Sequence, residues 1–150
     1  MKYSHIIWDW NGTLFNDAAW CMKVINKMLT RRGIAPFDDI FSYRDAFCFP
    51  VINYYKNAGF DLAKEPFGDL AKEFINLYHA DKSGRCKLND DSIFVLKSMH
   101  SAQIAQVILS ASEVNNLLSQ INEFDISHFF DEILGLSDIY AKSKIELGLD

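Results

Sequence analysis

Three side chains of the types that act on phosphate esters each follow a predicted strand: Asp9, Ser110 and Lys144. The carboxyl ends of parallel strands meet at one edge of a sheet, where open α/β sheets bind their ligands. There a carboxylate such as Asp9 can attack phosphorus as a covalent nucleophile. The Ser110 hydroxyl, nearby amides such as that of Ala111 and the Lys144 ammonium would hold phosphoryl oxygens and neutralise their charge. These residue types therefore make phosphoryl chemistry the first hypothesis.

Short apolar runs of β-prone residues predict the strands that position these side chains, at 3–8, at 104–109 and within 129–134. We expect the first of them to be a buried strand. Apolar residues at helical spacing, with capping or breaking residues at their ends, predict the helices. These helices cover 17–32, 36–44, 51–58, 66–78, 90–99, 113–121 and a stretch from 141 onward. Asp17 is expected to cap the first helix, and Gly33 is expected to end it.

The order of these elements is strand, helical insert, helix, strand, helix, strand. This order predicts an α/β fold, a parallel sheet with a helical domain inserted after its first strand. Residues 1–14 and 88–150 would form the α/β core, and residues 15–87, a run of helices without a clear strand, would form the insert. The length of 150 residues fits one domain, or one core with an insert.

The composition excludes several classes of protein. Hydrophobic residues make up 49% and charged residues 23%, the balance of a soluble globular chain. With a net charge of −5 and no strongly basic stretch, the chain has no face for nucleic acid. We find no secretory signal and no apolar run long enough to span a membrane. The three cysteines are widely spaced and lack zinc-site spacing, which indicates reduced thiols in a cytoplasmic protein.

The strings IIWDWNGTL, ILSAS and AKSK together resemble the motifs of the haloacid dehalogenase superfamily of Asp-nucleophile phosphohydrolases. The helical stretch 15–87 stands where the phosphoglycolate-phosphatase-like branch of that family has its helical cap. The resemblance implies a partial haloacid dehalogenase-like Rossmannoid core with an inserted cap. It also implies Mg²⁺-dependent hydrolysis of a small phosphorylated metabolite through an aspartyl-phosphate intermediate.

The resemblance also implies roles for individual residues. Asp9 would be the nucleophile, and its carboxylate and the backbone carbonyl of Asn11 would bind Mg²⁺. Ser110 matches the second motif, and Lys144 matches the third, with Lys142 as the other choice and a solvated helix lysine as the alternative. Arg44 lies where the caps of the family place a specificity loop, so it would contact substrate; the alternative is an ordinary surface arginine.

Asn11 departs from the family pattern, which has a second aspartate at this position. That aspartate protonates the leaving group and then deprotonates water, whereas an amide does not exchange a proton near neutral pH. General acid–base catalysis of this kind contributes typically about 10²–10⁴-fold. Two alternatives to a phosphatase therefore stay open: a catalytically inactive binding or interaction module, and a dehalogenase-like hydrolase.

The acidic fourth motif of the family, which supplies carboxylates to Mg²⁺, has no counterpart before residue 150. We therefore expect a C-terminally shortened chain that binds Mg²⁺ weakly. We also expect the first strand to have an open edge, because the strand of the fourth motif would lie beside it. Such an edge pairs with a second protomer to give a homodimer, is covered by the chain's own C-terminal segment, or leaves the chain poorly folded.

Overall fold

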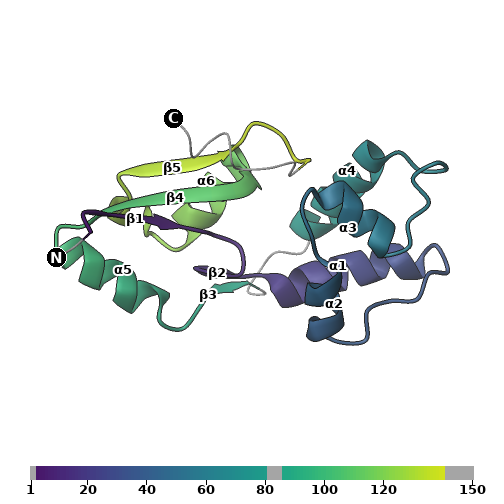
Figure 1. Cartoon of the computed structure of the whole chain (residues 1–150), viewed down its shortest axis with the longest axis horizontal. Helices are drawn as coiled ribbons and strands as arrows, with labels where there is room; N and C mark the ends of the chain where they lie inside the picture. The colour runs from purple at the N-terminus through teal and green to yellow at the C-terminus, as the bar shows by residue number, and fades with distance from the viewer. Residues whose placement is uncertain (1–2, 81–85, 141–150) are drawn as a thin grey trace. The chain divides into compact units, whose positions relative to one another are not determined.

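The computed structural model describes residues 3–80 and 86–140, which divide into two compact units (Figure 1). One unit contains the described residues up to Asn16 together with Lys87–Asp138. The other contains the described residues from Asp17 to Cys86, joined by Ile139 and Tyr140. Lys142, Lys144 and the helix predicted from residue 141 lie outside the described residues.

A parallel three-stranded sheet forms the centre of the first unit. It consists of β1 (His5–Trp8), β4 (Ala105–Glu113) and β5 (Glu132–Leu136), in the order β1-β4-β5 (Figure 1). All three strands were predicted, and the α/β class is confirmed. The register pairs Trp8 with Ile108 and Ile108 with Ile133, so β1 ends opposite Ile108 and the last residues of β4 extend beyond it.

Two helices connect these strands, α5 (Ser92–Ser101) before β4 and α6 (Val114–Glu123) after it, and a short 3-10 turn, η1 (Ser127–Phe129), precedes β5. Alternate residues of β4 are fully buried, among them Gln106 and Ile108. The buried apolar side chains of both helices complete the core of this unit: Leu96, Leu117 and Ile121. Burial of such aliphatic side chains contributes roughly 1.5–3 kcal/mol each.

The prediction that the first strand is buried was wrong for one of its faces. The burial of β1 alternates, and the Ile7 side chain is 64% exposed. The physical reason is the alternation of side chains along a strand: Ile6 and Trp8 point to the partly buried face of the sheet, and His5 and Ile7 point to the exposed face. Among the described residues, β1 pairs with β4 alone. A homodimer through the other edge of β1 stays a prediction.

The second unit is helical, with α1 (Ala18–Thr30), α2 (Ile40–Ala46), α3 (Val51–Asn57) and α4 (Phe67–Ala80). Its core consists of aromatic and aliphatic side chains, including Ile25, Met28, Leu29, Tyr54 and Leu70. The helix predicted over 36–44 begins later, at Ile40. Asp39 and Ser42 form a capping box there, in which each side chain bonds the backbone N–H of the other residue.

Asp17 precedes α1, but its side chain does not cap that helix as predicted. Instead Asp17 Oδ2 accepts hydrogen bonds from Tyr78 Oη at 3.2 Å and from Cys21 Sγ at 3.6 Å. Burial and the neighbouring Asp17 carboxylate raise the pKa of the Cys21 thiol. Cys21, Cys48 and Cys86 are all free thiols, as the sequence indicated.

Gly33 follows α1 with φ of +68°, the conformation expected of a residue that ends a helix.

Two short strands occur where the sequence predicted a run of helices without a strand. They are β2 (Phe15–Asn16) and β3 (Lys87–Leu88), which pair antiparallel with Phe15 opposite Leu88. Their pairing joins the point where the chain leaves the first unit to the point where it returns. Within residues 3–80 and 86–140, no helix combines the length and the apolar character needed to cross a bilayer.

Gln106 is a buried polar side chain that joins three parts of the first unit. Its Nε2 donates to the carbonyls of Leu96 at 3.1 Å and Phe129 at 3.2 Å, and its Oε1 accepts from Trp8 Nε1 at 3.0 Å. Replacement by methionine keeps the volume but removes these bonds. We predict that Gln106→Met lowers the free energy of unfolding by about 1–3 kcal/mol.

Urea denaturation followed by circular dichroism measures this difference. The control is Gln103→Met, because Gln103 is an exposed turn residue, and we expect a change within about 0.5 kcal/mol there. Equal stability of the Gln106→Met variant and the unchanged chain would show that the buried hydrogen bonds contribute nothing net.

Candidate active site

The loop after β1 has a fixed conformation that begins at Asp9. The backbone N–H groups of Thr13 and Phe15 both donate to the Trp10 carbonyl, at 3.2 and 3.0 Å. Gly12 has φ of +79°, a left-handed conformation that favours glycine, and its N–H donates to Phe15 O at 2.7 Å. The loop therefore folds back on itself immediately after the strand, as the turn residue in the motif predicted.

Trp10 anchors this loop in the core of the first unit. Its side chain is fully buried, and its indole Nε1 donates to Gln120 Oε1 on α6 at 2.8 Å. The indole also stacks on Phe15, with ring centroids 5.2 Å apart and planes 10° from parallel. Asp9 thus lies between two tryptophans, Trp8 and Trp10, whose indoles both hydrogen-bond to glutamines of the same unit.

The Asp9 carboxylate is half-buried and oriented by its own loop. Thr13 Oγ1 donates a hydrogen bond to Asp9 Oδ2 at 3.2 Å. The Asp9 side chain therefore lies at the carboxyl end of β1 with one oxygen held by a neighbouring hydroxyl. This is the position that the sequence predicted for a nucleophile.

Ser110 is part of β4 rather than the residue after it, because the strand continues to Glu113 with a register shift between Leu109 and Glu113. The sequence prediction ended the strand at Leu109 because the apolar run stops there and small polar residues follow. The Ser110 side chain is 1% exposed, and its Oγ accepts from the backbone N–H of Ser112 at 3.1 Å. Ala111, between them, is half-buried.

The loop after β1 and the last residues of β4 meet at Asn11. Asn11 Oδ1 accepts a hydrogen bond from Ser112 Oγ at 2.7 Å and a long one from Ser110 Oγ at 3.5 Å. The structure therefore joins Asn11 and Ser110, both singled out from the sequence, to Ser112, which was not. The available signal was the second hydroxyl of ILSAS, two residues beyond Ser110 and therefore on the same side of an extended strand.

Glu113 is a second residue that the sequence reasoning missed as part of this edge. Its carboxylate caps α6, because Oε1 accepts from Asn115 N and Oε2 from Asn116 N, both at 3.0 Å. Asn115 Nδ2 also donates to Oε1, at 2.7 Å. A carboxylate thus already lies on backbone amides at the α6 terminus, where an anion would otherwise be favoured.

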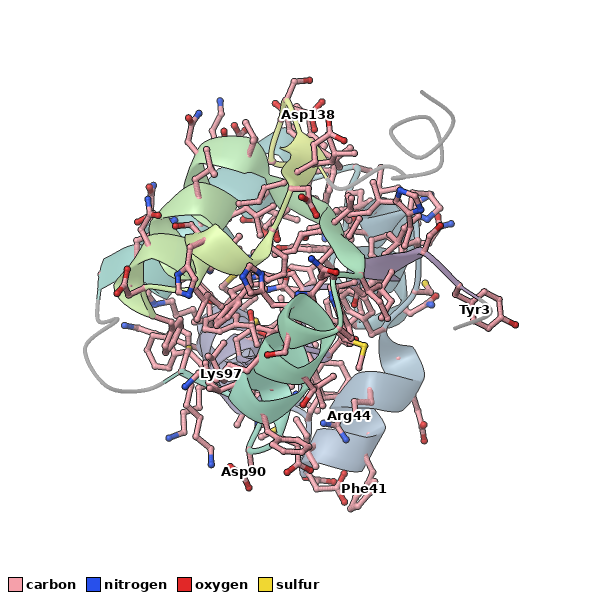
Figure 2. The ribbon with its side chains drawn as sticks, turned by 90° about the vertical axis from the view of Figure 1, so that its left-hand side faces the viewer. Tyr3, Phe41, Arg44, Asp90, Lys97 and Asp138 are labelled. Atoms are coloured by element: carbon pink, nitrogen blue, oxygen red, sulfur yellow. The ribbon has the colours of Figure 1, made fainter. Side chains whose placement is uncertain are left out.

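The roles of the remaining predicted site residues are not tested by the described structure. Arg44 is exposed on α2 in the second unit, where it is labelled with the exposed Phe41 of the same helix (Figure 2). Lys144 and Lys142 lie outside the described residues. The roles assigned to Arg44 and Lys144 therefore stay predictions.

The donors at this edge are hard oxygens: the Asp9 carboxylate and the backbone carbonyl of Asn11. Such donors suit Mg²⁺, which takes carboxylates, carbonyls and water in octahedral geometry. The described part of the chain contains no cluster of three or more histidine, cysteine, aspartate or glutamate side chains placed to hold a metal. Binding of Mg²⁺ by the Asp9 carboxylate and the Asn11 carbonyl therefore stays a prediction.

The parallel sheet with its covering helices defines an α/β fold. Comparison with models of protein families identifies the family to which the chain belongs. The model of the haloacid dehalogenase-like hydrolase family matches residues 6–145. The chain belongs to that family, as the motifs indicated. No curated protein matches the chain in sequence.

Solved structures of this fold resemble the chain at low sequence identity. A predicted phosphoglycolate phosphatase from Haemophilus somnus is 16% identical with a TM-score of 0.75, over 92% of this chain and 66% of that one. A predicted phosphatase from Clostridium acetobutylicum is 19% identical with a TM-score of 0.73, over 98% and 69%. A haloacid dehalogenase-like family protein from Streptococcus pneumoniae is 18% identical with a TM-score of 0.70, over 90% and 62%. The chain thus spans about two thirds of the length of such proteins.

Gly135 of β5 lies directly against the backbone of Ser112 and Val114, at the end of β4 and the start of α6. A Cβ at this position would lie 2.9 Å from Ser112 O and 2.9 Å from Val114 Cα, closer than real side chains approach backbone atoms. We predict that Gly135→Ala displaces residues 112–114 and lowers the free energy of unfolding by about 1–3 kcal/mol.

Urea denaturation measures the loss of stability, and amide chemical shifts of Ser112 and Glu113 report the displacement. The matched control is Gly68→Ala on α4, where a Cβ would meet Tyr140 Oη at an ordinary 3.7 Å. Alanine is the better helix former, so that variant should be as stable as the unchanged chain or slightly more stable. Unchanged Ser112 shifts in Gly135→Ala would contradict the close contact.

Proposed function

We propose that this chain carries the nucleophile site of a phosphatase-type hydrolase that acts on a small phosphorylated metabolite. The observation that supports this proposal is the Asp9 carboxylate, held by Thr13 at the carboxyl end of β1 beside the Asn11–Ser112 hydrogen bond. Membership of a hydrolase family agrees with it, as do the solved structures of similar fold that are described as phosphatases.

In the proposed reaction an Asp9 carboxylate oxygen attacks phosphorus, and the bond between phosphorus and the ester oxygen breaks. The leaving oxygen takes a proton from solvent water, since the Asn11 amide has none to give, and the products are an aspartyl-phosphate and a free alcohol. Water then attacks the aspartyl-phosphate, which releases inorganic phosphate and regenerates the Asp9 carboxylate. The Thr13 hydroxyl keeps the carboxylate oriented, and the Ala111 amide and the Ser110 hydroxyl are assigned to the phosphoryl oxygens.

The Asp9 carboxylate and the Asn11 carbonyl would hold Mg²⁺ in this proposal. A bound Mg²⁺ would supply charge neutralisation, which reduces the repulsion between the Asp9 carboxylate and an anionic phosphate. Lys144 is assigned the same electrostatic role by its place in the motif, and Arg44 is assigned a contact with the rest of the substrate.

One observation favours a second candidate function. The side chain that faces Ser112 is the amide of Asn11, which has no proton to exchange near neutral pH. Without an acid at this position, a bound phosphoryl group would be hydrolysed slowly. A module that binds a phosphorylated ligand without turnover is therefore the alternative function.

Replacement of the proposed nucleophile tests the first function directly. We predict that Asp9→Asn reduces Mg²⁺-dependent hydrolysis of p-nitrophenyl phosphate to the background rate, because an amide does not form the aspartyl-phosphate. The control is Asp90→Asn, which changes an exposed carboxylate of the same unit that pairs with Lys87 at its surface. Full activity of the Asp9→Asn variant would remove Asp9 from the mechanism.

Replacement of the amide by an acid tests the effect of Asn11. Ser112 Oγ can donate to a carboxylate oxygen as it donates to Asn11 Oδ1, so Asn11→Asp should keep the loop geometry. We predict that turnover of alkyl phosphates, whose leaving groups need a proton, rises by about 10²-fold or more. Steady-state kinetics of the variant, with the Asp9→Asn, Asn11→Asp double variant as the inactive control, measures this change. An unchanged or lower rate would favour the binding function or a dehalogenase-like reaction.

A further inference from the structure

The turn that leads into α5 holds the loop after β1 through its backbone carbonyls. Asn89 Nδ2 donates a hydrogen bond to the Thr13 carbonyl at 2.5 Å, and Asn89 N donates to the Leu14 carbonyl at 2.9 Å. Ser92 Oγ donates to the same Leu14 oxygen at 3.1 Å. Donors of one turn therefore hold two consecutive carbonyls of the loop, and all of these residues belong to the first unit.

The orientation of the Asn89 amide follows from the chemistry of its partner. A backbone carbonyl only accepts hydrogen bonds, so the group that faces Thr13 O is the NH₂ group of Asn89. The turn is itself closed, because Ser92 N donates to Asn89 O at 3.0 Å. The N-cap residue of α5 is Asp91, two positions further on. The Asn89 amide thus bonds the loop after β1 rather than the start of its own helix.

We propose that Asn89 is a positioning residue for the Asp9 carboxylate and that it acts through Thr13. Its amide holds the Thr13 backbone in the place from which Thr13 Oγ1 donates to Asp9 Oδ2, at 3.2 Å. This inference rests on the proposed function, in which Asp9 is the nucleophile. It assigns Asn89 no contact with the phosphoryl group.

The backbone of Thr13 decides where its hydroxyl points. Threonine is branched at Cβ, so its χ1 torsion takes one of a few staggered rotamers relative to the backbone. The N–H of Thr13 donates to Trp10 O at 3.2 Å, at the long end of the usual range, whereas its carbonyl is bonded by Asn89. Loss of the Asn89 donor would release the carbonyl side of Thr13, and its hydroxyl would no longer be directed at Asp9.

The direction of the Asp9 carboxylate matters because attack on phosphorus is roughly in line with the bond that breaks. The terminal torsion of an aspartate is broad, so a hydrogen bond to one carboxylate oxygen narrows its range. A carboxylate only accepts, so the Thr13 hydroxyl must be the donor in this bond. A misdirected nucleophile lowers the rate of attack, whereas binding of the phosphate is assigned to other groups.

The rotamer of Thr13 gives a test that needs no turnover. In the full 150-residue chain, three-bond couplings from the Thr13 methyl carbon to the backbone nitrogen and carbonyl carbon report χ1. We expect one rotamer in the unchanged chain, and in Asn89→Ala a ratio of bonded to unbonded rotamers that is lower by roughly two- to tenfold. Asn89→Asp keeps the size but places an acceptor against the Thr13 carbonyl, so it should have at least the same effect.

Ser92→Ala is the matched control, because it removes another donor of the same turn. Leu14 O keeps its hydrogen bond from Asn89 N in that variant, and the Asn89 amide still reaches Thr13. Because Ser92 is buried, we expect Ser92→Ala to lower the stability and to leave the Thr13 rotamer unchanged. Circular dichroism of each variant shows whether the fold is intact.

Steady-state kinetics test the consequence for the reaction. With p-nitrophenyl phosphate and Mg²⁺, we expect Asn89→Ala to lower kcat about three- to tenfold with KM nearly unchanged. Thr13→Val removes the hydroxyl, keeps the shape and should lower kcat at least as much. The double variant should match Thr13→Val alone, because Asn89 acts only through that hydroxyl. Asn122→Ala, which changes an exposed amide of α6, should leave both constants unchanged.

The proposal is overturned if Asn89→Ala leaves the Thr13 rotamer unchanged, or if Ser92→Ala changes it equally, since the whole turn would then hold the loop. It is also overturned if the two single losses in kcat multiply in the double variant. The proposed function fails separately, if turnover survives Asp9→Asn or the unchanged chain has none. In that case the rotamer measurement still decides whether Asn89 positions Thr13 against Asp9.

Discussion

The in-step parallel pairing of β1 with β4 is the constraint on which the candidate site depends. Each residue from His5 to Trp8 lies opposite its counterpart from Ala105 to Ile108, so β1 ends level with Ile108 and β4 continues beyond that point to Glu113. Asp9 and the Ser110–Ser112 segment are neighbours for this reason, although about one hundred residues separate them in sequence. A slip of one residue would turn the alternate side chains of β4 to the wrong faces of the sheet.

The sequence predicted the features that depend on residues close together in the chain. A strand, a polar residue and a glycine turn predicted the place of Asp9, and apolar runs predicted all three strands of the sheet. The boundaries that differed depend on local hydrogen bonds: α2 begins at Ile40 because Asp39 and Ser42 cap each other there. The exposure of Ile7 depends instead on what covers that face of the sheet, which no pattern within the strand records.

The contacts that shape the site were less predictable, because they depend on tertiary structure. Asn11 and Ser112 both lie beyond the last β1–β4 pair, so their hydrogen bond depends on the path of the chain after that pair and not on strand register. The register shift of β4 against β5 in the same segment leaves no clear mark in a short stretch of small residues. Asp17 illustrates the same limit in the helical unit. Its sequence position favours a helix cap, yet the Tyr78 hydroxyl and the Cys21 thiol, from α4 and α1, take its Oδ2 instead.

The two tryptophans that flank Asp9 have an energetic consequence for ligand binding. Trp8 and Trp10 each donate an indole hydrogen bond to a buried glutamine, and Trp10 is sealed in the core. The backbone around Asp9 therefore loses its conformational freedom when the chain folds, not when a ligand arrives. Association then carries little entropic penalty at this loop. A ligand that binds this loop only when β1 and β4 are paired stabilises the paired state by linkage. Its binding free energy then adds to the free energy needed to separate the two strands.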